Sequence, residues 1–194
     1  MEKKIIITCF EPFGGDSFNA SAAVAGAMAQ SICGMPVEKV TLPVEFGRCA
    51  EVALARARSA ELIVCLGEAR GRRAVTPELA AINLNYAAIP DNAGAEPKDE
   101  QIDANGNTAY FTRFPARLLA ERIKAEGVPA ALSYSAGAYV CNDLYYRLLR
   151  ENENGGARVV FIHVPRAERE EDYKNMALAI SNALSAVICE ERNG

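Results

Sequence analysis

The chain has 194 residues, a length at which one hydrophobic core is ordinary, and we expect a single domain over residues 1–194. Hydrophobic residues make up 50% and charged residues 24%, which excludes a disordered chain and does not indicate a membrane protein. The net charge of -4, without a clustered basic stretch, argues against nucleic acid or a membrane surface and favours a small molecule or a peptide as partner.

The N-terminal sequence and the cysteines predict a cytoplasmic protein. The apolar run that starts at Ile5 ends at Glu11, which is too short for a signal-peptide core or a membrane span. Without a secretory signal, we expect the six cysteines to be reduced thiols, with Cys141 as a special case. The other five are expected to be small buried hydrophobic side chains: Cys9, Cys33, Cys49, Cys65 and Cys189.

Short apolar runs alternate with helical patterns along the chain. Strands are expected over residues 4–10, 37–44, 62–66, 130–135 and 159–162. Helices are expected after a cap at Ser21 and over residues 46–60, 115–127, 140–151 and 169–189. Residues 74–85 are expected to be extended with a break at Pro77, and residues 89–106 form a polar stretch.

This alternation predicts an α/β fold, a three-layer α/β/α sandwich with a mostly parallel central sheet. In such sheets ligands bind beyond the carboxyl ends of the strands. We therefore expect the loops after Phe10, Leu66, Ser135 and Ile162 to converge.

Cys141 and His163 are the candidates for chemistry at that edge. His163 is the only histidine and directly follows the strand 159–162, where it suits a general base, although a structural histidine near the core is the alternative. Cys141 is expected in the first turn of a helix, where the helix N-terminus lowers the pKa of a thiol. The 22 residues from Cys141 to His163 (163 minus 141) cross one helix and return along the next strand, so both reach one edge.

A thiolate beside an imidazole is the arrangement that attacks a carbonyl carbon, and neighbouring backbone N–H groups can hold the resulting oxyanion. An acid usually orients the imidazole, but the composition leaves this acid open among 25 carboxylates. No metal is expected, because one histidine and scattered cysteines give no zinc-like spacing. The Phe-Gly-Gly turn at Phe13 matches neither the P-loop nor the dinucleotide fingerprint.

A series of short motifs occurs in a fixed order along nearly the whole chain. They lie at residues 10–15 (Phe-Glu-Pro-Phe-Gly-Gly), 19, 42–44, 67–72, 76–78, 81–84, 89–92, 133–137, 140–142 and 161–165. In these motifs the chain resembles the pyroglutamyl peptidase I (pyrrolidone carboxyl peptidase) family of cysteine peptidases. The set is too long and too ordered for a chance match.

The resemblance implies a triad of Cys141, His163 and Glu78 that hydrolyses the bond after an N-terminal pyroglutamate of peptides through a thioester, without a cofactor. A flat neutral lactam packs on aromatic faces and needs only hydrogen-bond partners. The implied substrate pocket contains Phe10, Phe13, Asn19, Glu68, Tyr139 and Val140. Taken alone, the two phenylalanines would be core aromatics, Asn19 a helix cap and Glu78 a solvated acid.

The chain departs from the family at three places. Glu68 stands where relatives carry glutamine or another neutral residue, and Ala88 stands where they carry an arginine. The missing cation would weaken catalysis unless Arg70 or Arg73 replaces it, and a solvated role for these two arginines is the alternative. The segment after Pro165 is short, which affects the homo-oligomer, dimer or tetramer, that the resemblance suggests.

Two other functions remain as alternatives at this point. One is a catalytically impaired relative that binds pyroglutamyl or other lactam ligands. The other is a nucleoside-handling enzyme on a similar scaffold, because a fold alone does not determine function.

Overall fold

The computed structural model describes residues 3–193, so residues 1, 2 and 194 of the predicted domain lie outside the described residues. The strands are β1 (Lys4–Phe10), β2 (Ser31–Ile32), β3 (Met35–Leu42), β4 (Ala60–Glu68), β5 (Thr76–Glu78), β6 (Ala80–Ile82), β7 (Ala109–Phe111) and β8 (Arg158–Val164). The helices are α1 (Ala20–Ala27), α2 (Arg48–Arg56), α3 (Ala116–Ala125), α4 (Val140–Glu151) and α5 (Glu170–Asn193). None of these described helices has the length and apolarity that crossing a membrane requires.

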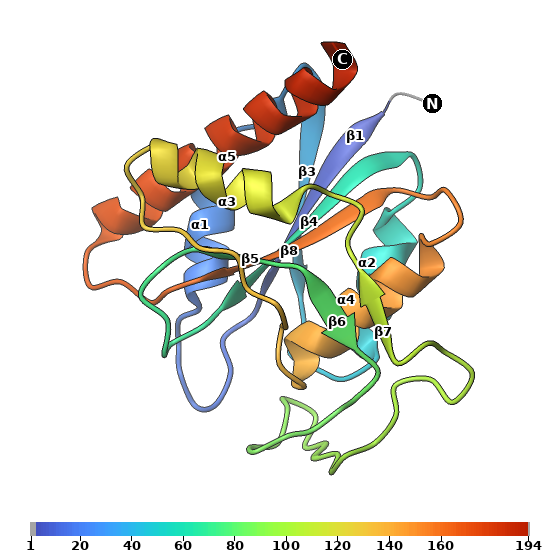
Figure 1. The fold of residues 1–194 in the computed structure, drawn as a ribbon. Helices are drawn as coiled ribbons and strands as arrows, with labels where there is room; N and C mark the ends of the chain where they lie inside the picture. The colour runs from blue at the N-terminus through green and yellow to red at the C-terminus, as the bar shows by residue number, and fades with distance from the viewer. Residues whose placement is uncertain (1–2, 194) are drawn as a thin grey trace.

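A central sheet lies between two layers of helices (Figure 1). Its strand order is β2-β3-β1-β4-β8-β5. Helices α1, α3 and α5 pack on one face of this sheet, and α2 and α4 pack on the other. The predicted α/β/α sandwich is confirmed.

Alternate side chains of the strands belong to the two separate cores, as the two-residue period of a strand requires. On β1, Ile5 belongs to the core under α1, α3 and α5, and Ile6 belongs to the core under α2 and α4. On β8, Val160 belongs to the first core and Phe161 to the second. His163 follows Phe161 by two residues and therefore faces the side that α4 covers.

The pairing of the strands is mostly parallel, as predicted. β1 pairs in parallel with β3 and β4, and β4 pairs in parallel with β8. The edge strands β2 and β5 are antiparallel to their neighbours. The register of β5 on β8 places Thr76 opposite His163 and Glu78 opposite Phe161.

The prediction of a strand over residues 130–135 is wrong. This segment runs beside β5, where the N–H groups of Ala131 and Ser133 donate to the carbonyls of Val75 (3.1 Å) and Pro77 (2.9 Å). Only two isolated bridges form, at Ala130 and Ser133, because the chain bends at Tyr134 and leaves the edge of the sheet. The apolar pattern therefore marked an extended edge segment that pairs too briefly to be a strand.

Two helix starts also differ from the sequence prediction. α2 begins at Arg48 and not at Phe46, because Gly47 has a φ of 70° that a right-handed helix does not accommodate. α1 begins at Ala20, and its cap is Asn19 and not Ser21.

The region between residues 74 and 111 contains three short strands that the sequence did not resolve. Pro77 lies within β5 instead of breaking an extended segment, because β5 is an edge strand of the sheet and the missing N–H of proline is tolerated there. β6 and β7 pair with each other as a separate antiparallel sheet.

The prediction of free thiols is wrong for Cys33 and Cys189, which form a disulfide. The turn between β2 and β3 packs beside α5, so the two Cα atoms lie 6.4 Å apart, within the reach of a disulfide. The two cysteines are 156 residues apart in sequence, a distance at which no local pattern reports proximity. Cys9, Cys49 and Cys65 are free and buried, as predicted.

Candidate active site

Cys141 and His163 meet at the carboxyl edge of the sheet. Cys141 lies in the first turn of α4, as predicted, and His163 is the penultimate residue of β8. Gly67 of β4 lies directly opposite His163 in the register of the two strands. A Cβ atom added at Gly67 would lie 3.1 Å from Sγ of Cys141, so the nucleophile and the histidine approach the same backbone position.

Glu78 is the acid beside the imidazole. Its Oε1 lies 2.7 Å from Nδ1 of His163, and its side chain is completely buried. The hydroxyl of Tyr145 donates to the backbone carbonyl of Glu78 at 3.0 Å and thereby holds β5 against α4. The structure thus brings together the three residues that the resemblance implied for the triad.

Arg72 also contacts this group, and the sequence prediction missed it. Its Nη1 donates to Oε1 of Glu78 at 2.5 Å, and the same nitrogen donates to Oγ1 of Thr76. Sequence reasoning named Arg70 and Arg73 instead, because all three arginines lie in one loop and nothing local distinguishes them. The only available signal was that Arg72 ends the motif 67–72.

The pKa of His163 is lowered from its usual value by burial, which outweighs the hydrogen bond and the charge of Glu78. The charge of Arg72 lowers it further. The imidazole is therefore neutral at neutral pH and is ready to accept a proton.

The expected lowering of the Cys141 pKa is wrong. Burial, with smaller contributions from Glu78 and Cys65, raises the pKa of the Cys141 thiol to about 12. Arg72 and the backbone N–H of Cys141 lower it, but they do not outweigh the loss of water around the sulfur. The resting pair is consequently a thiol and a neutral imidazole, and the proton must move during the attack.

A cavity of about 140 Å³ opens onto Cys141 and His163. The rings of Phe13 and Tyr139 form part of its wall, with centroids 6.4 Å apart. All six residues predicted for the pocket line it, together with the two reacting residues and two residues that the sequence prediction did not include, Val44 and Ala136. The six are Phe10, Phe13, Asn19, Glu68, Tyr139 and Val140.

Asn19 and Glu68 shape this cavity, but their polar atoms are already engaged with the protein. Oδ1 of Asn19 accepts from the backbone N–H of Ser21 at 2.9 Å, and its Nδ2 donates to a carbonyl of the β1–α1 loop. Oε2 of Glu68 accepts from the N–H of Ala20 at 2.6 Å, and Oε1 accepts from Nε of Arg70 at 2.7 Å. Both side chains therefore hold the start of α1, and Asn19 is also the helix cap that its residue type alone suggests.

Arg70 supports the wall of the cavity and not the nucleophile. Its guanidinium carbon lies 4.8 Å from the centroid of the Phe13 ring, and its Nη2 pairs with Asp16 at 2.6 Å. Arg166 pairs with the same carboxylate at 2.6 Å. These ion pairs anchor the loop that carries Phe13 to the ends of β4 and β8.

Ala88 is exposed and does not line the cavity. The segment that follows it is tied to the site by the hydroxyl of Tyr139, which donates to the carbonyl of Pro90 at 3.1 Å. The amide of Asn92 donates to the carbonyl of Pro12 at 3.0 Å. This segment therefore contributes to the rim through the carbonyl of Pro90 and the side-chain amide of Asn92.

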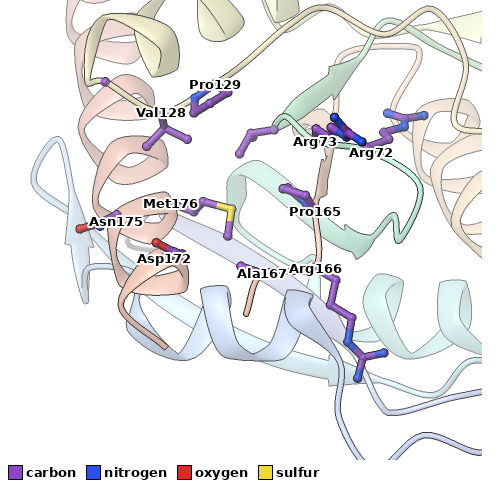
Figure 2. Close-up of a pocket in the computed structure, with 12 residues that line it drawn as sticks. Arg72, Arg73, Val128, Pro129, Pro165, Arg166, Ala167, Asp172, Asn175 and Met176 are labelled. Atoms are coloured by element: carbon purple, nitrogen blue, oxygen red, sulfur yellow. The ribbon is translucent and has the colours of Figure 1, made fainter. Parts of the chain in front are cut away.

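A larger cavity, of about 410 Å³, lies between the loop before β5 and the start of α5 (Figure 2). Arg72, Arg166 and Met176 are among its lining residues, but Cys141 and His163 are not. The smaller cavity is therefore the candidate active site. Within residues 3–193, no group of His, Cys, Asp and Glu side chains is arranged to hold a metal ion.

The family model described as Pyroglutamyl peptidase matches residues 3–188. A pyrrolidone-carboxylate peptidase of Levilactobacillus brevis is 41% identical over 167 residues, which cover 84% of this chain and 81% of that protein. A pyrrolidone-carboxylate peptidase of Lactobacillus johnsonii is 36% identical over 204 residues, which cover 98% and 94% of the two chains.

Solved structures agree with these sequence matches. The pyroglutamyl peptidase I of Bacillus amyloliquefaciens superposes with a TM-score of 0.85 at 37% identity, covering 96% of each chain. The pyrrolidone carboxyl peptidase of Thermococcus litoralis superposes with a TM-score of 0.86 at 30% identity, covering 98% of this chain and 96% of that one. The chain belongs to the pyroglutamyl peptidase family.

Proposed function

We propose that this chain removes N-terminal pyroglutamate from peptides, with Cys141 as nucleophile, His163 as general base and Glu78 as the acid that orients the imidazole. The observation that carries this proposal is the single cavity that Cys141 and His163 share with the aromatic side chains, with Glu78 hydrogen-bonded to His163 behind it. Membership of the family sets aside the nucleoside-handling alternative.

The reaction begins with the neutral pair. The Nε2 atom of His163 accepts the proton of the Cys141 thiol while Sγ forms a bond to the carbonyl carbon of the pyroglutamyl residue. Backbone N–H groups in the first turn of α4, with that of Cys141 among them, stabilise the oxyanion. Glu78 stabilises the imidazolium, because Nδ1 donates to its carboxylate.

The tetrahedral intermediate then breaks down to a thioester, and water hydrolyses that thioester. The C–N bond breaks as the imidazolium gives its proton to the leaving amine, which leaves a pyroglutamyl thioester on Cys141. A water molecule, deprotonated by His163, attacks the thioester and releases pyroglutamic acid. The proton then returns from His163 to the sulfur, and the resting thiol and imidazole are restored.

The cavity favours a neutral ring over a charged amino terminus. Its walls include Phe10, Phe13 and Tyr139, and the carboxylate of Glu68 is already bound to Ala20 and Arg70. A protonated amine would lose its water there without gaining a free partner. Burying even a neutral polar group without a hydrogen bond costs on the order of 2 to 7 kcal/mol, and burying a charge costs more. A lactam presents no such charge.

The test compares fluorogenic amides of pyroglutamate, glutamate and glutamine on the wild-type chain and on Cys141→Ser. We expect the pyroglutamyl amide alone to be cleaved, and cleavage to be lost in the variant. Comparable cleavage of all three amides would contradict the pocket assignment. Binding of a pyroglutamyl amide without cleavage by the wild-type chain would instead support the impaired lactam-binding relative.

We further propose a cytoplasmic location and a homo-oligomer for a one-domain chain. Both proposals rest on the resemblance to the family, and the cytoplasmic location also suits a cysteine nucleophile that must stay reduced. Light scattering on the purified protein measures the oligomer, and a monomeric mass would contradict it. Fractionation of cells against a secreted marker tests the location.

A further inference from the structure

We propose that Arg72 is a positioning residue of this peptidase, which holds the carboxylate of Glu78 in the orientation that His163 needs and places a fixed positive charge beside the nucleophile. This inference rests on the proposed function. It concerns a residue outside the triad, and it starts from one shared atom. Oε1 of Glu78 accepts from both Nδ1 of His163, at 2.7 Å, and Nη1 of Arg72, at 2.5 Å.

The other oxygen of Glu78 explains why a second donor matters. Oε2 is buried and has no hydrogen-bond partner among the described residues. A carboxylate held only by the imidazole can rotate and exchange its two oxygens, because Oε2 makes no bond that resists the rotation. A guanidinium bond to Oε1 keeps that oxygen on Nδ1 and so fixes the plane of the imidazole.

Arg72 is itself held in place. The same Nη1 also donates to Oγ1 of Thr76, and Thr76 lies directly opposite His163 in the register of β5 on β8. The backbone N–H of Arg72 donates to the carbonyl of Ala69 at 3.0 Å, which closes the turn after β4. The side chain retains 30% of its exposure, so its outer edge remains in contact with solvent while Nη1 is engaged.

The charge of Arg72 also offsets the charge of Glu78 at both reacting groups. Glu78 raises the pKa of His163 and of Cys141, and Arg72 lowers both. Among the other ionisable groups near the site, the Cys65 thiol raises the pKa of Cys141, and Glu68 lines the cavity but is paired with Arg70. Arg72 therefore adds to the effect of burial in keeping the base neutral, and it favours negative charge on the sulfur.

The experiment uses the fact that His163 is the only histidine, so one set of imidazole NMR signals reports its titration without any assay of activity. The variants are Arg72→Gln, Arg72→Lys and Thr76→Val, with Arg73→Gln as the matched control. Arg73 is the next residue in the chain, and it is exposed and makes no side-chain hydrogen bond or ion pair among the described residues.

We expect Arg72→Gln to raise the pKa of His163 and to lower kcat by about ten- to a hundredfold, the range known for outer partners of metal-binding histidines. KM should change by less than about twofold, because Arg72 does not line the substrate cavity. Arg72→Lys should leave the pKa of His163 close to its wild-type value. Thr76→Val should change the pKa of His163 and kcat in the same direction as Arg72→Gln, but more weakly. Arg73→Gln should match the wild type.

An unchanged His163 titration and an unchanged kcat in Arg72→Gln would overturn the inference. If Arg72→Gln does not fold, Thr76→Val decides the question, and wild-type values in that variant would also overturn it. The NMR titration separates this outcome from a failure of the proposed function. A wild-type chain that cleaves no pyroglutamyl amide can still show whether Arg72 controls the pKa of His163.

Discussion

The backbone of Gly67 passes so close to the ring of Phe161 that a Cβ atom at Gly67 would lie 2.7 Å from Cζ of that ring. The same Cβ atom would lie 3.1 Å from Sγ of Cys141. Gly67→Ala therefore should move the ring or the nucleophile, with a stability loss of about 1 to 3 kcal/mol from overpacking and a fall in kcat of at least about tenfold. Chemical denaturation and the fluorogenic assay measure the two effects.

Gly71→Ala is the control for this prediction. Gly71 lies four residues further along the chain, in the loop after β4, and a Cβ atom there meets nothing within 4 Å. We expect wild-type activity and stability from this variant. Equal losses in both variants would show that the proximity of Gly67 to Phe161 and Cys141 is not the cause.

Alkylation should label Cys141 selectively and should accelerate with pH. Because burial raises the pKa of Cys141 to about 12, the thiolate fraction grows about tenfold per pH unit between about pH 7 and pH 9. Cys141 is partly exposed and lines the active-site cavity, whereas Cys9, Cys49 and Cys65 are buried and do not line it, so these three should remain unlabelled in the folded protein. Mass spectrometry after iodoacetamide treatment locates the label. A labelling rate that is already constant near pH 7 would indicate a preformed thiolate and contradict this account.

The acid limb of the pH–activity profile should lie at a pH below the usual pKa of a histidine. A general base acts only when it is neutral, and burial lowers the pKa of His163 below its usual 6.5. Therefore kcat/KM should be constant as pH falls toward 6.5 and should decline only below it. His163→Ala removes the only histidine and should reduce kcat by about a hundred- to ten-thousandfold. An acid limb that is centred above pH 6.5, or a fully active His163→Ala variant, would be inconsistent with this role.

Glu68 should matter for stability and for substrate binding more than for chemistry. Glu68→Ala leaves the N–H of Ala20 and Nε of Arg70 without their acceptors, which costs about 1 to 3 kcal/mol. Glu68→Gln keeps an acceptor for Ala20 and should cost less. Because Arg70 also packs on Phe13, KM for the pyroglutamyl amide should rise in both variants. Glu51→Ala, which breaks an exposed pair with Arg48, should change neither quantity.

Reduction should destabilise the chain without inactivating it. The disulfide between Cys33 and Cys189 closes a loop with a sequence separation of 156, and such a link contributes about 2 to 5 kcal/mol. Thermal unfolding with and without dithiothreitol measures the difference, which should vanish in Cys33→Ser. Neither cysteine lines the active-site cavity, so kcat/KM at moderate temperature should stay the same. A wild-type melting temperature that does not respond to the reductant would argue against the bond.

The sequence by itself determined the layered sheet and the edge at which chemistry occurs. The runs at residues 4–10, 62–66 and 159–162 contain side chains that are apolar on both faces, and such runs are typical of strands covered by helices on both sides. Once these strands are parallel, their carboxyl ends meet, and the helix that starts just before Cys141 must begin at the same edge. Cys141 and His163 were therefore placed together by topology alone.

The resemblance to a family was needed for Glu78. Nothing in residues 76–78 distinguishes this carboxylate from the other acids of the chain, because its burial depends on the antiparallel register of β5 on β8. A shift by one residue would turn the side chain of Glu78 to the opposite face. The register is set by packing along the whole edge and not by the three residues of the strand.

Only the tertiary structure decided the partners and the electrostatics. It selected Arg72, and not Arg70 or Arg73, as the arginine on Oε1 of Glu78, and it paired Cys33 with Cys189. It also reversed the expected pKa shift of Cys141, because the exclusion of water outweighs the helix N-terminus. A sequence pattern records which face of an element is apolar, whereas hydrogen-bond partners and local water content are properties of the packed chain.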